Sequence, residues 1–421
     1  MNQAVASLVQ AATTAANEGR WPEAHRLWQE VLAREPRHPQ ALFSLGVHAF
    51  RDGKLAEANR LLQAAREVAP REPGVLLALG VVRRELGDDA GELAAIEAAL
   101  AVDPLSVQGL LAKAMHLERT GRRREAAAVY GNALKAAPPE AHWPPSMRES
   151  LLRGRELVHR NGEDMAAFLA ARIGDRFGAL TPFEAERWRE AGALLSGQSR
   201  AYPSVCSSLH VPRLPAIPFF ERSLFPWAEA LEAQTAVITA ELGEALAHEG
   251  SDFRPYVAYA PGAPVNQWHE LNHSTRWSSY FLWRNGQPVV AHQQRCPKTT
   301  AALAEVPMAD LGGLCPNAMF SALAPRTRIP PHHGETNARV VVHLPLVVPP
   351  GCSYRVGFEE RQWKVGEILA FDDSIEHEAR NDGDELRVIL IFDVWNPLLS
   401  AGERDMVRAL SAAAHEFQAQ R

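Results

Sequence analysis

At 421 residues, of which 46% are hydrophobic, the chain is long enough for two or three domains with substantial cores. Its formal net charge of −6 argues against a general binder of nucleic acid or of anionic membranes. The sequence has no run of about 18 apolar residues, so we expect no transmembrane helix.

The cysteines and the N-terminal segment bear on the compartment. The four cysteines are scattered and form no Cys-x-x-Cys pair, which argues against a disulfide framework: Cys206, Cys296, Cys315 and Cys352. The N-terminal segment lacks the basic residues and long apolar stretch of a signal peptide. We therefore expect a cytoplasmic protein with reduced thiols.

The first 140 residues repeat with a fixed period. Glycines recur every 34 residues, at Gly19, Gly53, Gly87 and Gly121, and prolines do the same, at Pro36, Pro70, Pro104 and Pro138. This period is typical of tetratricopeptide-type helix pairs. Glycine permits a left-handed turn after the first helix of a pair, and proline cannot continue the second.

Small residues at matching offsets indicate where the two helices of each pair approach closely. They are Gly46, Gly80 and Ala114 on the first helix, with Ala24, Ala58 and Ala126 on the second. Such arrays bury a core only by stacking, and their concave face usually binds a peptide or protein. A scaffold that only dimerises or solubilises the chain is the alternative.

The middle of the chain is predicted to contain further helices and then an irregular segment that leads into the next domain. Periodic apolar positions predict two or three helices in a connector over residues 141–205. A Pro-rich stretch from Val211 to Phe220 leads into a helix expected from Trp227 to Glu249. At the C-terminus, Ser400-x-x-Glu403 is a capping box. The helix it begins carries Met406, Leu410, Ala413 and Phe417 on one face.

Between Ser321 and Pro397 the pattern changes to short β-type runs. They span residues 340–348, 367–371 and 387–394, and Pro-Pro, Pro-Gly and Asp-Gly pairs punctuate them. This is typical of an all-β barrel or jelly roll.

Two histidines and an arginine in this segment suggest a metal site beside an anion site. Neutral imidazoles at His332 and His377 suit Fe(II), Zn or Cu. An oxygenase with two histidines and a carboxylate would have Asp or Glu two residues after the first histidine, where Gly334 stands. Arg387 lies among aliphatic residues and would be costly to bury unless it grips an anion such as a carboxylate.

The segment resembles the aspartyl/asparaginyl β-hydroxylases, which are Fe(II)- and 2-oxoglutarate-dependent oxygenases on a double-stranded β-helix. The matching motifs are Pro331-His332-x-Gly334-x-Thr336-Asn337, Val342-His343-Leu344, Phe371-Asp372-Asp373-Ser374-x-Glu376-His377-Glu378, Arg387 and Asp393-Val394-Trp395. Upstream, Trp277-Ser278-x-x-x-Leu282-Trp283 and Pro297-Lys298-Thr299 extend the match to about 200 residues. The family holds iron with two histidines and no carboxylate, which agrees with Gly334.

The resemblance implies a role for each matching residue. His332 and His377 would bind iron, with His333 as a less favoured alternative to His332. Arg387 and Ser321 would hold the distal carboxylate of 2-oxoglutarate, and His343 would lie near its proximal carboxylate.

Further residues follow from the same match. Trp277 would pack against the cosubstrate, and Arg339 would face the substrate. The family tends to carry a second basic residue where this chain has Val341. Residues 339, 341 and 343 share one face of a strand, so one charge on that face is lost. Apart from the match, four acidic residues could also bind metal, although we expect them to be polar loop residues that support His377: Asp372, Asp373, Glu376 and Glu378.

Together these observations predict an α+β multidomain protein. An all-α tetratricopeptide-type solenoid would occupy residues 1–140 and a helical connector residues 141–205. Residues 206–421 would form the double-stranded β-helix, a jelly-roll or cupin-like oxygenase domain with flanking helices.

By resemblance, the enzyme would couple O2 and 2-oxoglutarate to hydroxylation of a side chain in a peptide or protein docked by the repeats. The β-carbon of an Asp- or Asn-type residue is the favoured target, and Val341 leaves a small-molecule or lipid-linked substrate open. A catalytically inactive scaffold is one alternative. A zinc hydrolase is another, because His269-Glu270-Leu271-Asn272-His273 matches the His-Glu-x-x-His motif, though in poor helical context.

Overall fold

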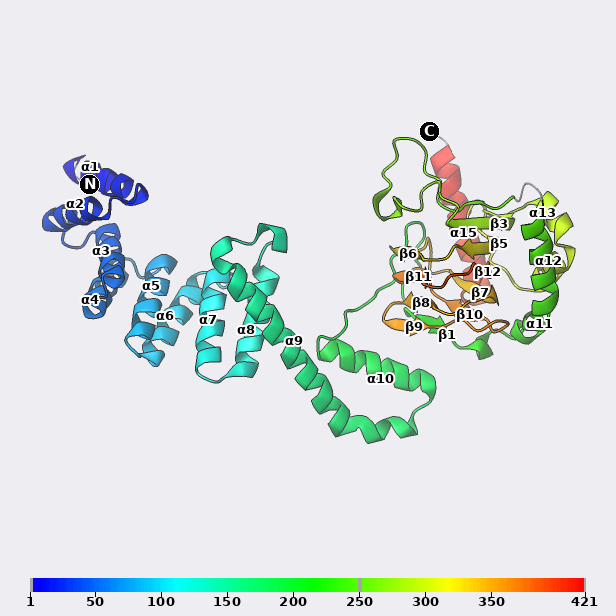
Figure 1. Ribbon diagram of the computed structural model, residues 1–421, viewed down its shortest axis with the longest axis horizontal. Helices are drawn as coiled ribbons and strands as arrows, with labels where there is room; N and C mark the ends of the chain where they lie inside the picture. Colours follow the sequence, from blue (N-terminus) through cyan, green and yellow to red (C-terminus); the bar gives the residue numbers. More distant parts are fainter. Residues whose placement is uncertain (1–2, 249–251, 420–421) are drawn as a thin grey trace. The chain divides into compact units, whose positions relative to one another are not determined.

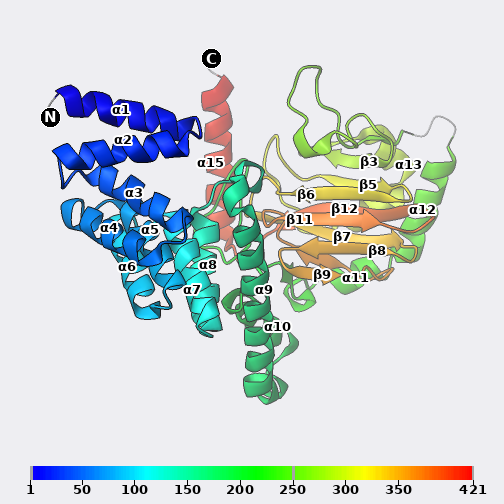
Figure 2. The same cartoon turned by 60° about the vertical axis from the view of Figure 1, so that its left-hand side comes forward.

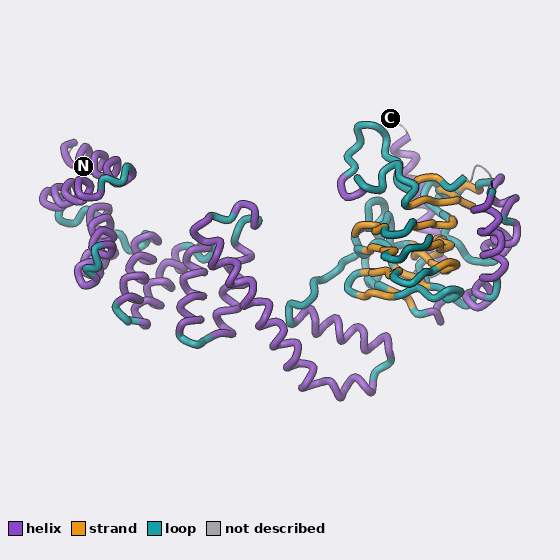
Figure 3. The backbone as a smooth tube through the Cα atoms, viewed as in Figure 1, coloured by secondary structure: helices purple, strands orange, loops and turns teal. Residues whose placement is uncertain are grey.

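A computed structural model of the chain describes residues 3–248 and 252–419. The chain divides into two compact units. The first comprises Met1–Gly178 with Leu195–Gln198, and the second comprises Ala179–Leu194 with Ser199–Arg421. The first unit is helical, whereas the second contains the strands together with further helices (Figure 1, Figure 3). The predicted connector of residues 141–205 is thus divided between the two, and the predicted domain limits stay predictions.

The first unit is the expected array of helix pairs. Its helices are α1 (Gln3–Asn17), α2 (Trp21–Arg34), α3 (Pro39–Arg51), α4 (Leu55–Val68), α5 (Pro73–Glu85), α6 (Asp89–Val102), α7 (Val107–Arg119) and α8 (Arg123–Ala136). The four repeating glycines lie between paired helices with φ between +74° and +80°. This left-handed conformation suits glycine, which has no Cβ to clash. The helical repeat prediction is confirmed.

Close helix approach explains the small residues of the array. A Cβ placed on Gly46 of α3 would lie 2.7 Å from Cγ of Leu62 on α4. One continuous apolar core runs from Val5 through Ala95, so neighbouring pairs bury a shared interior.

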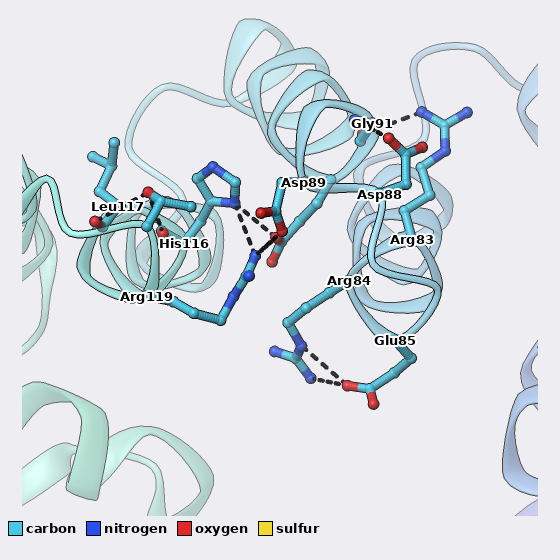
Figure 4. Close-up of polar contacts among 11 residues, drawn as sticks. Arg83, Arg84, Glu85, Asp88, Asp89, Gly91, His116, Leu117 and Arg119 are labelled. Atoms are coloured by element: carbon cyan, nitrogen blue, oxygen red, sulfur yellow. Dashed lines mark hydrogen bonds and ion pairs between the residues drawn. The ribbon is translucent and has the colours of Figure 1, made fainter.

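A polar network also joins neighbouring pairs of the array. Buried His116 on α7 lies 2.7 Å, through Nδ1, from a carboxylate oxygen of buried Glu92 on α6. The Arg119 guanidinium contacts Glu92 as well and lies 2.7 Å from Asp89 (Figure 4). The buried carboxylate is therefore paired, as burial of charge requires.

The segment after α8 contains one long helix, α9 (Pro145–Ile173), and a shorter one, α10 (Pro182–Leu195). A short 3₁₀ turn (Glu140–His142) precedes α9, and another (Gly174–Ala179) follows it. The prediction of two or three helices here is confirmed.

The second unit contains two antiparallel sheets (Figure 2). The larger has the order β1-β10-β7-β12-β5-β3-β2, with β4 paired to β3, and the smaller has the order β6-β11-β8-β9. The strands are β1 (Phe219–Phe220), β2 (Arg254–Pro255), β3 (Trp277–Arg284), β4 (Gln287–Pro288), β5 (Ala318–Leu323), β6 (Thr327–His332), β7 (Arg339–Val347), β8 (Cys352–Val356), β9 (Glu359–Arg361), β10 (Leu369–Phe371), β11 (His377–Asn381) and β12 (Arg387–Trp395). This is the expected β-rich domain of double-stranded β-helix type.

Both faces of the large sheet are covered, which explains its long apolar runs. On β7, Val340, Val342 and Leu344 share a core with residues of the helices. These helices are α11 (Ala228–Glu232), α12 (Thr235–Ala247) and α14 (Pro297–Ala304), and α13 (Val290–Arg295) precedes the last. Val341 belongs to a second core together with residues of the small sheet, so strand alternation separates a structural face from a site-forming face.

The helix expected from Trp227 to Glu249 is two helices, α11 and α12, and Glu249 lies outside the described residues. The break follows Glu232, whose carboxylate accepts hydrogen bonds from the Ile368 backbone N–H at 3.0 Å and from Arg222. These tertiary contacts fix the end of α11 against the sheet.

The C-terminal helix α15 (Ala401–Ala419) begins at the predicted capping box. The Ser400 N–H donates to Glu403 Oε2 at 2.8 Å, and the Glu403 N–H donates to Ser400 Oγ at 3.3 Å. Its apolar stripe lies largely outward, since Met406 is 67% and Phe417 71% exposed, whereas Val407 is buried. Within residues 3–248 and 252–419, no helix is long and apolar enough to cross a membrane.

Candidate active site

A cavity of about 520 Å³ opens among the inner faces of the two sheets. Its wall contains every residue predicted for the site: Ser321, Trp277, His332, Arg339, His343, His377 and Arg387. They come from β3, β5, β6, β7, β11 and β12, so both sheets contribute.

The two predicted metal-binding histidines are direct neighbours across the small sheet. His377 on β11 pairs with His332 on β6, and their ring centroids lie 4.0 Å apart. Each ring donates from Nδ1 to the carbonyl two residues before it, Pro330 at 2.8 Å and Ile375 at 2.9 Å. A carbonyl only accepts, so each neutral ring keeps its Nε2 lone pair free, as a metal ligand must.

Burial favours the metal-binding form of both rings. It lowers the pKa of His377, which is only 6% exposed, to about 4. Burial and the neighbouring His377 lower the pKa of His332 to about 3, although part of His332 remains accessible to solvent. Both imidazoles are thus neutral near pH 7, the state that binds a divalent metal.

Gly334 lies against a carboxylate that sequence reasoning assigned only a supporting role. A Cβ at Gly334 would collide with the carboxylate of Asp373. Asp373 therefore fills the space that a side chain at position 334 would need. His333 is exposed and donates from Nδ1 to the Ser374 carbonyl at 2.9 Å, which fixes it to the neighbouring loop.

Arg387 is a buried cation without its usual partners. The residue is 1% exposed, and its Nε and Nη1 have no hydrogen-bond partner among the residues that the structure describes. Burial lowers the pKa of Arg387 to about 10, and its guanidinium lies 4.9 Å from the centroid of the Trp363 ring. Ser321 faces the same cavity and accepts a 3.1 Å hydrogen bond from the Trp277 indole N–H. This arrangement fits an anionic ligand such as a carboxylate.

His343 is held as a single tautomer. The Trp363 indole donates to His343 Nδ1 at 3.2 Å, so the neutral ring carries its proton on Nε2. Burial, with Arg387 nearby, lowers the pKa of His343 well below its usual value. His343 is therefore a neutral hydrogen-bond donor.

Two family models match parts of this chain. The aspartyl/asparaginyl beta-hydroxylase family model matches residues 232–397, and a tetratricopeptide repeat model matches residues 9–59 and 49–107. The chain contains an aspartyl/asparaginyl beta-hydroxylase domain. The two family models thus match separate segments of the chain, the repeats before the hydroxylase domain.

Curated relatives match part of the chain. "Aspartyl/asparaginyl beta-hydroxylase" of Mus musculus is 36% identical over 152 residues, which is 36% of this chain and 20% of that protein. "Aspartate beta-hydroxylase domain-containing protein 2" of Xenopus tropicalis is 31% identical over 230 residues, 53% of this chain and 59% of that protein. "Ornithine lipid ester-linked acyl 2-hydroxylase" of Rhizobium tropici is 33% identical over 186 residues, 44% of this chain and 62% of that protein. The chain thus spans between a fifth and about three fifths of these relatives.

Arg339 of the hydroxylase domain differs from Arg387 in being surrounded by acids. Its guanidinium lies 2.9 Å from Asp373, 3.1 Å from Glu335 and 3.5 Å from Asp393. The predicted substrate-facing residue therefore lines the cavity with its charge already engaged, and its role toward substrate stays a prediction. The matching motifs contained Asp373 and Asp393 but not Glu335, and they gave no sign that these acids converge on one arginine.

Two of the predicted supporting acids form ion pairs on the outer side of β11. Glu376 contacts Arg200 at 2.6 Å and Arg355 at 3.1 Å. Glu378 contacts Arg355 at 2.6 Å and also pairs with Arg328. These pairs brace the strand that carries His377.

An aromatic wall of the hydroxylase domain was missed by the sequence analysis. Tyr256 stacks on Trp277 with centroids 4.1 Å apart, and Trp268 meets the His332 ring edge-on at 4.9 Å. Tyr256 and Trp268 lie in segments with little regular secondary structure, where no periodic pattern marks a shared face.

The zinc-hydrolase alternative lacks the helix on which it depends. Its motif follows a 3₁₀ turn (Asn266–Trp268) and forms turns, with His269 and Glu270 exposed and His273 at φ +57°. In the described part of the chain, no group of three or more His, Cys, Asp or Glu side chains is placed to hold a metal ion.

Proposed function

We propose that the hydroxylase domain is an Fe(II)- and 2-oxoglutarate-dependent oxygenase that hydroxylates a side chain of a peptide or protein. The observation that carries the proposal is the buried, unpaired guanidinium of Arg387 in the same cavity as two facing neutral histidines. A dicarboxylate cosubstrate would supply the missing anion, and the histidines would hold the metal.

His332 and His377 would hold Fe(II) through Nε2. When bound, the iron would supply the activation of O2 that is coupled to decarboxylation of the cosubstrate. The protein orients both rings through the carbonyls of Pro330 and Ile375. Gly334 has no side chain and so supplies no ligand of its own, and the carboxylate of Asp373 fills the space beside it.

The cosubstrate would lie against Arg387. Arg387 would grip its distal carboxylate bidentately, with Ser321 as an additional donor once it turns its hydroxyl toward the ligand. The Nε2–H of His343 would donate to the other carboxylate. Buried Tyr354 and Trp363 help to exclude water from this end of the cavity.

The overall reaction balances without a further reductant. One atom of O2 enters succinate as 2-oxoglutarate loses CO2, and the other enters the substrate as a hydroxyl group. The repeat array would bind the substrate chain and raise its effective concentration at the cavity. An Asp- or Asn-type residue is the target expected from the family. The relative named for an ornithine lipid makes a lipid-linked substrate the second candidate.

The test is anaerobic binding of 2-oxoglutarate with Fe(II), followed by succinate release in air. We expect binding by the wild-type chain, loss of metal binding in His377→Ala, and loss of cosubstrate binding in Arg387→Ala. Arg380→Ala is the matched control, since Arg380 lies on β11 and pairs with Glu360 outside the cavity wall. Failure of the wild-type chain to bind the cosubstrate would favour the inactive-scaffold alternative.

A further inference from the structure

The cavity of the hydroxylase domain has two ends of opposite charge. Arg387 and Asp393 lie six residues apart on β12, and both line the cavity. Six residues of extended strand separate them by roughly 20 Å. The Arg387 end holds an unpaired cation, whereas the Asp393 end gathers carboxylates.

The acidic end carries more negative than positive charge. Glu335, Asp373 and Asp393 converge on the single guanidinium of Arg339, at distances between 2.9 and 3.5 Å. Asp373 and Asp393 are 6% and 3% exposed, so water and salt screen them weakly. Burial raises the pKa of Glu335 and of Asp393, but three carboxyl groups still face a single guanidinium.

One of these carboxylates has an unused acceptor atom. Asp373 Oδ1 is buried without a hydrogen-bond partner, although Oδ2 accepts from Arg339. Asp393, in contrast, is satisfied by the backbone and side-chain N–H groups of Asn317 at 2.7 and 3.1 Å. A buried acceptor left open beside a cavity favours a ligand that donates a hydrogen bond.

Other groups nearby do little to offset this charge. Val341 is apolar and faces the cavity beside Arg339. Tyr256 is 41% exposed, and its phenol, like that of an ordinary tyrosine, is neutral near pH 7. The remaining cation of the wall, Arg284, is exposed at the end of β3, where solvent screens it.

Aromatic faces lie beside the same space. The stacked rings of Tyr256 and Trp277, with Trp268 next to His332, form part of the cavity wall. The face of an aromatic ring carries partial negative charge and attracts cations.

We propose that the substrate group bound next to the histidine pair is a cation, the side chain of Arg or Lys in a peptide. This inference rests on the proposed function, because it assigns the second ligand of the same cavity. A carboxylate there would face surplus negative charge without the basic residue that Val341 replaces. The Asp side chain expected from the family is therefore disfavoured at this site.

The test compares matched probes on the full chain with Zn(II) in place of iron and saturating 2-oxoglutarate, which occupies Arg387. The probes are the N-acetyl amides of arginine, glutamine and aspartate, and ligand-observed NMR gives each Kd. We expect the arginine amide to bind at least about tenfold more tightly than the aspartate amide, with glutamine between them. Equal or tighter binding of the aspartate amide would overturn the proposal.

Two variants that change a charge test whether these side chains determine the preference among the probes. Glu335→Gln, at a side chain 46% exposed and so tolerant of change, should weaken binding of the arginine amide several-fold and leave the glutamine amide unaffected. Val341→Arg should move the preference toward the aspartate amide. If both variants kept the wild-type preference for the arginine amide, these charges would not select the substrate.

A separate arm distinguishes the two proposals. In Arg387→Met without metal or cosubstrate, the competing cation is gone and the same order of affinities is expected. If the wild-type chain fails to bind 2-oxoglutarate but this variant keeps the order, the proposed reaction fails and the cation site stands. Loss of the order in this arm would overturn the cation site.

Discussion

Two buried arginines on the inner face of the large sheet have opposite surroundings. Arg339 on β7 meets three carboxylates, whereas Arg387 on β12 has Nε and Nη1 without partners. Both are at least 96% buried, so hydration stabilises neither charge. The paired arginine belongs to the fold, and the unpaired one provides a place for an anion.

The contrast between the two arginines indicates that Arg387 lowers the stability of the empty domain and is retained for ligand binding. A buried cation that awaits a ligand costs free energy in the empty protein, and the ligand recovers it on binding. Local departures from good packing and pairing are expected at functional sites. The same substitution at both arginines should therefore have opposite effects on stability.

The largest effect is expected for Arg339→Met. Removing the guanidinium leaves the buried carboxylates of Asp373 and Asp393 uncompensated, and breaking a buried ion pair costs about 3–5 kcal/mol. We expect the free energy of unfolding of the hydroxylase domain to fall by that amount in urea titrations followed by near-ultraviolet circular dichroism. Arg380→Met, at a partly exposed arginine, is the control. A loss below about 1 kcal/mol would show that the acids are already protonated or solvated.

Arg387→Met should do the reverse. Without the unpaired cation the empty domain should be equally stable or more stable, by about 1–3 kcal/mol, because methionine fills the space without a charge. Affinity for 2-oxoglutarate should fall by about 100-fold or more. The same urea titration and a cosubstrate titration measure both quantities. Destabilisation comparable to that of Arg339→Met would contradict the contrast between the two residues.

Periodic features of the molecule were predictable from the sequence. The repeated glycines recur because each helix pair needs the same left-handed turn, and the structure confirms that turn at all four positions. The run predicted at residues 340–348 is β7, Arg339–Val347, displaced by one residue. Such runs are readable because burial of both faces of a strand leaves a continuous apolar stretch.

Contacts between distant segments were not predictable. Asp373 meets Gly334 and Arg339 across 39 and 34 residues of chain, and no periodic pattern encodes such a contact. The Trp363 indole likewise fixes the tautomer of His343 from a loop between two strands. The resemblance to a family supplied the residue types of the site, whereas the charge balance around them came only from the folded arrangement.

A buried histidine of the site, His377, should make the stability of the domain depend on pH. Burial lowers the pKa of His377 to about 4, below the value of about 6.5 expected in the unfolded chain. Between these values the unfolded chain binds a proton that the folded domain does not. The free energy of unfolding of the metal-free domain should therefore fall as the pH drops from 6.5 toward 4, by about 1 kcal/mol per pH unit from this residue. Urea titrations at pH 7 and pH 5 should show a smaller difference in His377→Asn, and an unchanged difference would mean that His377 does not contribute.

The smallest effect is expected for a substitution of Trp363, which contacts both His343 and Arg387. Trp363→Phe keeps an aromatic ring beside the guanidinium but removes the indole N–H that donates to His343 Nδ1. His343 would then no longer be held with its proton on Nε2, and a lost hydrogen bond of about 1 kcal/mol corresponds to roughly a fivefold weaker affinity for 2-oxoglutarate. The matched control is Trp143→Phe, just after the repeat array, which loses a 2.8 Å indole hydrogen bond to the Pro138 carbonyl. Its cosubstrate affinity should not change. If the two variants bound 2-oxoglutarate equally well, the tautomer of His343 would not depend on Trp363, and the cosubstrate end of the cavity would rest on Arg387 and Ser321 alone.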